Sequence, residues 1–214
     1  MATRNVNLWS SPEHALEYLG HADTIPHRIE GERTLLEFIP ANAKRILDIG
    51  TGDGRLLGLV KAARPRAEFV GLDFSPTMLE AARRRFANDP AVTIVAHDFA
   101  NTLPPLGEFD SVVSSFAIHH VLHQRKRVLY AEVFQLLMPG GVFCNLEHVA
   151  SPTIQLHHQF LKQLDLSPEQ EDPSNKLLDV ETQLGWLNEI GFVNVDCHWK
   201  WRELALLAGV KPSA

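Results

Sequence analysis

Short apolar runs alternate with helical segments along most of the chain, and this alternation limits the possible folds more than any other feature. The apolar runs lie at 45–49, 68–73, 92–95, 109–116 and 142–146. Helical spacing of apolar residues follows at 56–63, 76–86 and 126–138. Strands of nearly continuous apolar content, joined through helices, are typical of a mainly parallel sheet that is covered on both faces. The alternation predicts a doubly wound, Rossmann-like α/β fold.

Ser75, at the N-cap, and Pro76 begin the second of these helices, and the sequence Pro139-Gly140-Gly141 ends the third. A further helical segment at 183–190 stops at Gly191. The runs 192–195 and 204–207 come after it, and we expect them to pair as the closing strands of the sheet.

Residues 1–40 and roughly 150–180 fall outside the alternation of strands and helices. In open α/β sheets, ligands bind beyond the carboxyl ends of the strands, where added segments act as covers. We therefore expect residues 1–40 to form an N-terminal helical cap. Residues 41–214 would form the main domain, with a lid insertion at about 150–180.

Composition excludes several classes of protein. The 214 residues contain 20 Lys and Arg against 26 Asp and Glu, a net charge of −6, which argues against binding nucleic acid through bulk charge. Two cysteines, Cys144 and Cys197, are too few for a disulfide framework. No run approaches the roughly 20 apolar residues of a membrane span. We expect a cytoplasmic protein without a membrane anchor.

The stretch Ile46–Gly54 reads I-L-D-I-G-T-G-D-G, a strand that runs through alternating glycines directly into a helix. Gly50 and Gly52 allow a sharp turn and let a ligand approach the backbone. The next strand ends in Asp73, where a carboxylate can accept both hydroxyls of a ribose. A plain turn with surface acids is the simpler interpretation, but the loop and the acid together indicate a cofactor that contains adenosine.

The glycine spacing separates two kinds of cofactor. Dinucleotide sites use G-x-G-x-x-G, whereas this loop has G-x-G-x-G. Asp48 stands two residues before the first glycine, where it would repel a pyrophosphate and would suit a cationic ligand. S-adenosylmethionine carries a sulfonium and an ammonium group. A nicotinamide-dependent oxidoreductase is therefore disfavoured.

These segments resemble the motifs of class I S-adenosylmethionine-dependent methyltransferases. Five motifs occur in the family's order, at 46–54, 71–75, 96–99, 109–116 and 137–141. Each is weak alone, but five in register are specific, and the resemblance covers about 41–147 together with the terminal hairpin. It implies a seven-stranded, mostly parallel sheet whose last strand is antiparallel.

The resemblance also implies roles for residues that hold the cofactor. Gly50 and Gly52 would line the methionine portion, and Asp48 would lie near its ammonium group. Asp73 would hold the ribose hydroxyls, and the backbone around Ser115 would close the methionine side.

For the adenine, the resemblance implies a site between aromatic and apolar side chains. Phe74 and Met78 would pack on the ring, Phe99 would flank it, and Asp98 would accept from its amino group. The helical spacing of Met78 fits a place in the core equally well.

Three histidines are candidates for a catalytic base. His119 and His120 follow the fourth strand, and His148 follows the fifth, so all three belong to the edge where the methyl group should point. A histidine near its usual pKa can take a proton from the acceptor. The alternative is that they make structural hydrogen bonds. Similar Ile-His-His strings occur in family members that modify small molecules and tRNA uridine.

We expect the cap and the lid to form most of the acceptor site. Tyr18, Arg28, His119 and His148 are the predicted substrate-binding residues, and Arg28 or Arg202 could hold an acceptor carboxylate. No metal is expected, because the closely spaced histidines have no acidic partner at an obvious spacing.

The sequence favours an S-adenosylmethionine-dependent methyltransferase that transfers a methyl group to a small molecule by in-line displacement. Two alternatives stay open: an enzyme of tRNA wobble-uridine modification that uses this cofactor or its carboxylated form, and a non-catalytic protein that binds the cofactor. Neither nucleic acid nor a membrane is expected as a partner, and a homodimer is left open.

Overall fold

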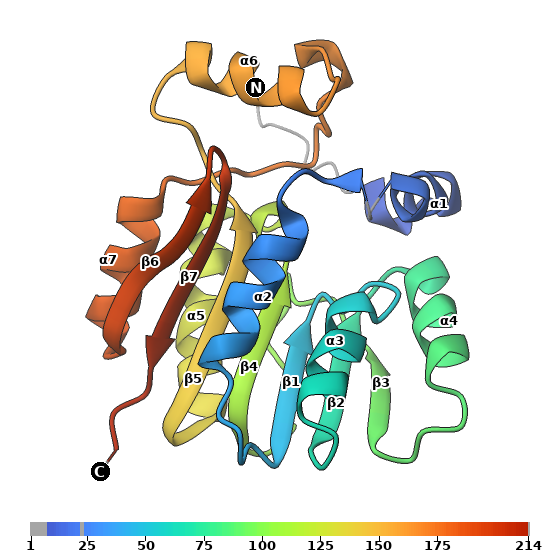
Figure 1. Ribbon diagram of the computed structural model, residues 1–214, viewed down its shortest axis with the longest axis vertical. Helices are drawn as coiled ribbons and strands as arrows, with labels where there is room; N and C mark the ends of the chain where they lie inside the picture. The colour runs from blue at the N-terminus through green and yellow to red at the C-terminus, as the bar shows by residue number, and fades with distance from the viewer. Residues whose placement is uncertain (1–7, 22–23, 214) are drawn as a thin grey trace.

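The computed structural model describes residues 8–21 and 24–213, and its centre is a seven-stranded sheet. The strand order is β3-β2-β1-β4-β5-β7-β6. Strands β1 to β5 pair in parallel, and β7 lies antiparallel between β5 and β6 (Figure 1). The expected fold class is confirmed. The strand bounds are β1 Arg45–Ile49, β2 Glu68–Asp73, β3 Val92–Ala96, β4 Phe109–Ser115, β5 Leu137–His148, β6 Val193–Trp201 and β7 Leu204–Val210.

Helices cover both faces of this sheet. Apolar residues of α2 and α3 pack with β1, β5 and β7 in one core cluster. Those of α5 and α7 pack with β1, β2, β4 and β5 in a second cluster. The helix α4 lies beside β3 (Figure 1). The helix bounds are α2 Arg28–Phe38, α3 Arg55–Ala63, α4 Pro76–Arg85, α5 His123–Leu136 and α7 Val180–Ile190.

Several predicted boundaries were wrong by a few residues. The helix expected at 126–138 ends at Leu136, because Leu137 already pairs with Phe109 in the sheet. The helix expected from 183 begins three residues earlier, since the Asp179 carboxylate accepts a hydrogen bond from the Thr182 amide at 2.7 Å.

The residue Ser75 occupies the predicted N-cap position of α4, but its side chain makes no capping hydrogen bond. Its backbone N–H instead donates to the Asp73 carboxylate at 2.8 Å. The polar group that orders this helix start therefore comes from the end of β2.

Both segments outside the alternation contribute helices to the carboxyl edge of the sheet. The 3₁₀ helix Leu8–Ser10 and α1 (Pro12–His21) lie at the carboxyl edge of the sheet, as does α6 (Ile154–Gln163), which stands above the strand ends (Figure 1). Helix α2 belongs to the layer on the sheet, where Leu35 is fully buried. The described part of residues 1–40 thus contributes both to the carboxyl edge of the sheet and to the core.

The chain order creates a crevice at this edge. From β1 it continues outward through β2 and β3, and then returns to place β4 on the other side of β1. The connections after β1 and β4 therefore diverge, which is where open α/β sheets bind ligands.

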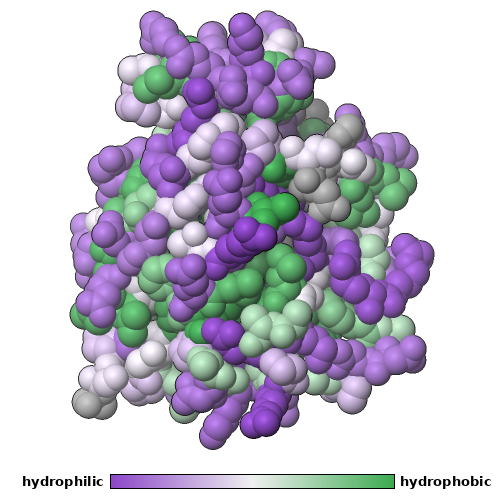
Figure 2. All heavy atoms as spheres, viewed as in Figure 1, coloured by the Kyte–Doolittle hydropathy of each residue, from purple (hydrophilic) through white to green (hydrophobic). Residues whose placement is uncertain are grey.

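Figure 2 shows apolar side chains gathered in the middle of the face that carries α2 and α3, with polar side chains around them. Within residues 8–21 and 24–213, no helix combines the length and the apolar character needed to cross a membrane.

Two helical glycines give a matched test of how α2 packs. A Cβ at Gly31 would come within 2.8 Å of Leu146 Cδ1 and 2.9 Å of the Trp199 ring, whereas a Cβ at Gly185 meets nothing within 4 Å. We expect Gly31→Ala to lower the free energy of unfolding by about 1–3 kcal/mol through overpacking. Gly185→Ala should raise it by about 0.5–1 kcal/mol. Denaturant unfolding measures both, and equal effects would contradict the close packing of α2.

Candidate functional site

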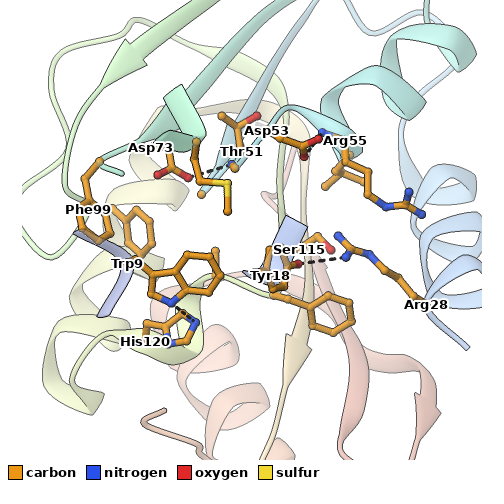
Figure 3. A pocket seen from close by; sticks show the side chains of 17 residues that line it. Trp9, Tyr18, Arg28, Thr51, Asp53, Arg55, Asp73, Phe99, Ser115 and His120 are labelled. Atoms are coloured by element: carbon orange, nitrogen blue, oxygen red, sulfur yellow. Dashed lines mark hydrogen bonds between the residues drawn. The ribbon is translucent and has the colours of Figure 1, made fainter. Parts of the chain in front are cut away.

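A pocket of about 670 Å³, counting its open mouth, lies above the carboxyl ends of β1, β2 and β4. Figure 3 shows Asp73 and Phe99 at one end and Arg28 and Arg55 at the other, with Trp9 and Tyr18 reaching in from the N-terminal segment. Seven of the nine predicted cofactor residues line it: Gly50, Gly52, Asp73, Phe74, Met78, Phe99 and Ser115. The crevice expected from the strand order is thus a real cavity.

The glycine loop makes one side of the pocket. Gly50 and Gly52 have φ values of 71° and 56°, which L-residues with a side chain rarely adopt. A Cβ at Gly50 would lie 2.2 Å from that of Ala117, so the loop packs directly on the segment after β4. A Cβ at Gly52 would meet nothing nearer than Met78 Sδ at 4.0 Å. The absence of a side chain there leaves space for a ligand.

The carboxylate of Asp73 connects the glycine loop to β2. Its Oδ2 accepts a hydrogen bond from the Gly52 amide at 2.9 Å, and its Oδ1 accepts one from the Ser75 amide at 2.8 Å. Burial raises the pKa of Asp73, although these hydrogen bonds favour the ionised form. Since Asp73 also lines the pocket, the same carboxylate can orient the loop and accept from a ligand.

Two predicted cofactor residues do not line this pocket. Asp48 lies behind the loop, 2% exposed, and accepts from the Thr51 hydroxyl at 2.8 Å. Asp98 lines an adjoining hollow together with Phe74 and Phe99. Asp48 therefore lies outside the lining of the pocket, while Asp98 lies next to its aromatic end.

The opposite end of the pocket carries two arginines, Arg28 and Arg55, together with Asp53. Glu32, 2% exposed, pairs with Arg28 at 2.8 Å and with Arg55 at 2.9 Å. Arg28 also donates to the Tyr18 hydroxyl at 3.0 Å, and its guanidinium lies over the Phe116 ring. Sequence reasoning missed Arg55, although its place directly after the third glycine was a usable signal.

The histidine His120 connects three parts of the chain. Its Nε2 accepts from Trp9 Nε1 at 2.9 Å, so in a neutral ring Nδ1 carries the hydrogen and faces the Ser174 hydroxyl at 3.0 Å. Burial lowers the pKa of His120 well below its usual value. Both nitrogens are engaged, so the geometry favours a structural role, although His120 lines the pocket.

A second cavity, about 700 Å³ with its mouth, adjoins the first and contains His119 and His148 in its lining. The two cavities share Trp9, Tyr18, Phe116 and His120. Apolar side chains supply much of the remaining lining: Ile25, Phe160, Leu161, Leu164, Leu166 and Leu204. Four of the five predicted catalytic or substrate residues, Tyr18, His119, His120 and His148, thus line one space.

Buried carboxylates hold both histidines of this cavity. His119 Nδ1 lies 2.7 Å from Glu147, and His148 Nε2 lies 3.0 Å from Glu203; both glutamates are fully buried. Burial lowers the pKa of His119 well below its usual value and raises that of Glu147, which Lys126 opposes. Sequence reasoning missed both glutamates, because nothing in the local pattern distinguishes them from surface acids.

Helix α6 is attached to the sheet through His157. Its Nδ1 lies 3.1 Å from Glu203 and its Nε2 lies 3.1 Å from Glu171. An imidazole between two carboxylates must donate from both nitrogens, which requires the protonated form. Burial lowers the pKa of His157, but the two carboxylates outweigh it and raise the pKa above its usual value.

Other predicted contacts are not brought together. Arg202 is exposed, its guanidinium lies over Trp201, and it lines neither cavity. Arg28 lines only the first cavity, so the two arginines do not meet at one ligand. Within the described ranges 8–21 and 24–213, no group of three or more His, Cys, Asp or Glu side chains is arranged to hold a metal ion.

The pocket lies where the connections after β1 and β4 diverge, and it has a glycine loop and an acid at the end of β2. These features define an α/β protein that binds a nucleoside-type ligand. A family model described as a methyltransferase domain matches residues 46–141. The demethylmenaquinone methyltransferase of Clavibacter sepedonicus is 31% identical over 192 residues, which are 81% of this chain and 76% of that protein. The chain therefore belongs to the class I S-adenosylmethionine-dependent methyltransferase family.

Other similarities are less complete. The demethylmenaquinone methyltransferase of Thermus thermophilus is 40% identical over 111 residues, so the match spans 51% of this chain but only 49% of that protein. An O-methyltransferase family protein from Burkholderia thailandensis has the same fold, with a TM-score of 0.76 at 16% identity. That likeness covers 100% of this chain and 64% of that one.

The buried Asp48 predicts a pH dependence of stability. Burial, together with the charges of Asp73 and Asp53, raises its pKa from 3.8 to about 7. The folded protein then keeps a proton that the unfolded chain releases, so this stabilisation is present below about pH 4 and is lost as the pH rises to about 7. Relative to wild type, Asp48→Asn should add roughly 2–4 kcal/mol more at about pH 8 than at about pH 4.

Denaturant unfolding of the ligand-free protein at the two pH values measures this difference. The amide oxygen that Asp48→Asn introduces can still accept from the Thr51 hydroxyl, so the variant removes mainly the charge. A stability difference that is the same at both pH values would show that Asp48 titrates normally.

Proposed function

We propose that the chain binds S-adenosylmethionine in the pocket of the glycine loop and methylates a small molecule held in the adjoining cavity. The observation that carries this proposal is the shared border of the two cavities, made by Trp9, Tyr18, Phe116 and His120. Ligands in the two cavities would therefore be immediate neighbours. A methyl donor and its acceptor need this arrangement for in-line displacement.

The residues of the pocket fit this ligand. Ser115 Oγ is buried in the lining and makes no hydrogen bond within the described part of the chain, so it can contact a polar group of the methionine portion. Asp73 would accept from the ribose hydroxyls. Phe74, Met78 and Phe99 would enclose the adenine, whose amino group would face Asp98.

The end of the pocket that carries the two arginines would hold a further part of the ligand. Arg28 and Arg55 line the end of the pocket opposite Asp73 (Figure 3) and would donate to the carboxylate of the methionine portion. Asp48 would act from behind the loop, through the Thr51 hydroxyl, rather than by touching the ammonium group.

When bound, S-adenosylmethionine supplies a methyl group on a sulfonium. The chain would hold the acceptor beside it and exclude water with α1 and the 150–180 segment, which we propose as cap and lid. His119 would accept the acceptor's proton at Nε2, while Glu147 holds Nδ1–H and thereby fixes the tautomer. The hydrogen bonds of His120 favour a role in closing the cap rather than in proton transfer.

The acceptor is proposed to be a ring compound with apolar substituents. Both relatives described above are named for methylation of demethylmenaquinone, and the aromatic and leucine side chains of the second cavity suit such a body. Glu171 and Asp172 in the same lining do not favour a polyanion, so tRNA modification is the weaker alternative. A cytoplasmic location and a homodimer stay predictions from the sequence.

Calorimetric titration with S-adenosylhomocysteine tests the cofactor assignment. Asp73→Asn should weaken binding by about 1.5–3 kcal/mol, or roughly 10- to 150-fold, because a charged hydrogen-bond acceptor for the ribose is lost. Asp89→Asn removes the same charge from an acid that pairs with Lys61 outside the lining, and it should leave the affinity unchanged.

Equal affinities of wild type and Asp73→Asn, with normal unfolding curves for both, would refute the ribose role. Mass spectrometry of ligands released from the denatured protein adds an independent check. A nicotinamide nucleotide in place of S-adenosylmethionine or its demethylated product would overturn the proposed function.

A further inference from the structure

Two histidine–glutamate pairs of the same design face the acceptor cavity. In each, one ring nitrogen is held by a fully buried carboxylate: His119 Nδ1 by Glu147 and His148 Nε2 by Glu203. Both oxygens of Glu147 also accept N–H donors, from the His148 backbone at 3.0 Å and from Asn145 at 3.3 Å. The carboxylates therefore act as acceptors, and the ring nitrogens that face them carry hydrogen.

The other nitrogen of each ring is available to a ligand. His119 Nε2 and His148 Nδ1 make no hydrogen bond among residues 8–21 and 24–213. In a neutral imidazole whose first nitrogen donates, the second presents a lone pair. The cavity thus offers two hydrogen-bond acceptors, each oriented by a carboxylate.

The two histidine rings are neighbours in the lining of the cavity. The ring centroids of His119 and His148 are 5.4 Å apart in a T-shaped contact. Neighbouring groups in a lining meet the same edge of a ring-shaped ligand. Hydroxyls on adjacent carbons project from one edge, whereas hydroxyls on opposite carbons project from opposite edges.

The rest of the lining disfavours a negatively charged acceptor. Phe116 and Phe160 are buried aromatic side chains of the lining, and Phe160 lies 5.2 Å from the His148 ring. Glu171 and Asp172 are also in the lining. Within the described residues, the lining contains no lysine or arginine, so an acceptor carboxylate would meet acids and no cation.

We propose that the acceptor is an uncharged aromatic compound with two hydroxyl groups on neighbouring carbons, which donate to His119 and His148 while its apolar body packs on the phenylalanines and leucines. This inference rests on the proposed function and names the substrate class of its second cavity. It replaces the expectation of an acceptor carboxylate held by Arg28 or Arg202.

Four probes with the same apolar group test the class. They are 4-tert-butylcatechol, 4-tert-butylphenol, tert-butylhydroquinone and 4-tert-butylbenzoate, each titrated into protein saturated with S-adenosylhomocysteine. The catechol should bind about tenfold more tightly than the phenol, as one added hydrogen bond gives. The catechol should also bind more tightly than the hydroquinone by a similar factor, and the benzoate should bind most weakly.

Two variants remove one free nitrogen each and keep the internal hydrogen bond. His119→Asn places an amide N–H near the Nδ1 position, facing Glu147, and His148→Gln places one near the Nε2 position, facing Glu203. In each, the affinities for catechol and phenol should become about equal. His158→Gln on the exposed side of α6 is the matched control and should retain the tenfold preference.

The outcomes separate this inference from the proposed function. If S-adenosylhomocysteine binds but the phenol, the hydroquinone or the benzoate binds as tightly as the catechol, or none of the four binds, only the substrate class is overturned. If S-adenosylhomocysteine does not bind, the proposed function fails and this inference fails with it. The comparison of the four probes on the wild-type protein tests the substrate class even if a variant does not fold.

Discussion

The hydrogen bonds of Asp73 hold the site together. This one carboxylate accepts the amide of Gly52 from the loop after β1 and the amide of Ser75 at the start of α4. The loop is further tied to β2 by the Thr51 amide and the Leu72 carbonyl, at 2.8 Å. The loop also packs on Ala117, so these contacts fix the ends of β1, β2 and β4 relative to one another. The pocket lies where the connections after these strands diverge.

In the second cavity, too, buried carboxylates connect separate segments of the chain by accepting hydrogen bonds. Glu147 and Glu203 leave solvent completely, and each does so in contact with a histidine. A buried charge is tolerated only where donors compensate for its lost hydration. Glu203 meets this condition with His148 and His157, and burial, which raises its pKa, is outweighed by their hydrogen bonds, so that its pKa lies below the usual value. The contact with His157 also joins helix α6 to the β6–β7 hairpin.

The sheet and most of the first pocket could be predicted because their signals are local. Strand periodicity and the glycine spacing each lie within a few consecutive residues, and parallel strands bring their carboxyl ends to one edge. Residues at the ends of β1, β2 and β4 therefore meet without further information. The position of Asp48 could not be derived in this way, since its burial depends on how the loop folds over it.

The chain's pattern alone predicted the order of strands and helices along the sequence and the region where a ligand should bind, because backbone geometry and apolar spacing act over short distances. The methyltransferase motifs came from the resemblance to a known family. Folding decided which polar groups pair across that region. Trp9 with His120, Glu32 with Arg55 and Glu203 with His157 are separated by 111, 23 and 46 residues. Such partners are selected by packing and by the cost of leaving a buried polar group unpaired, and neither is visible in local sequence.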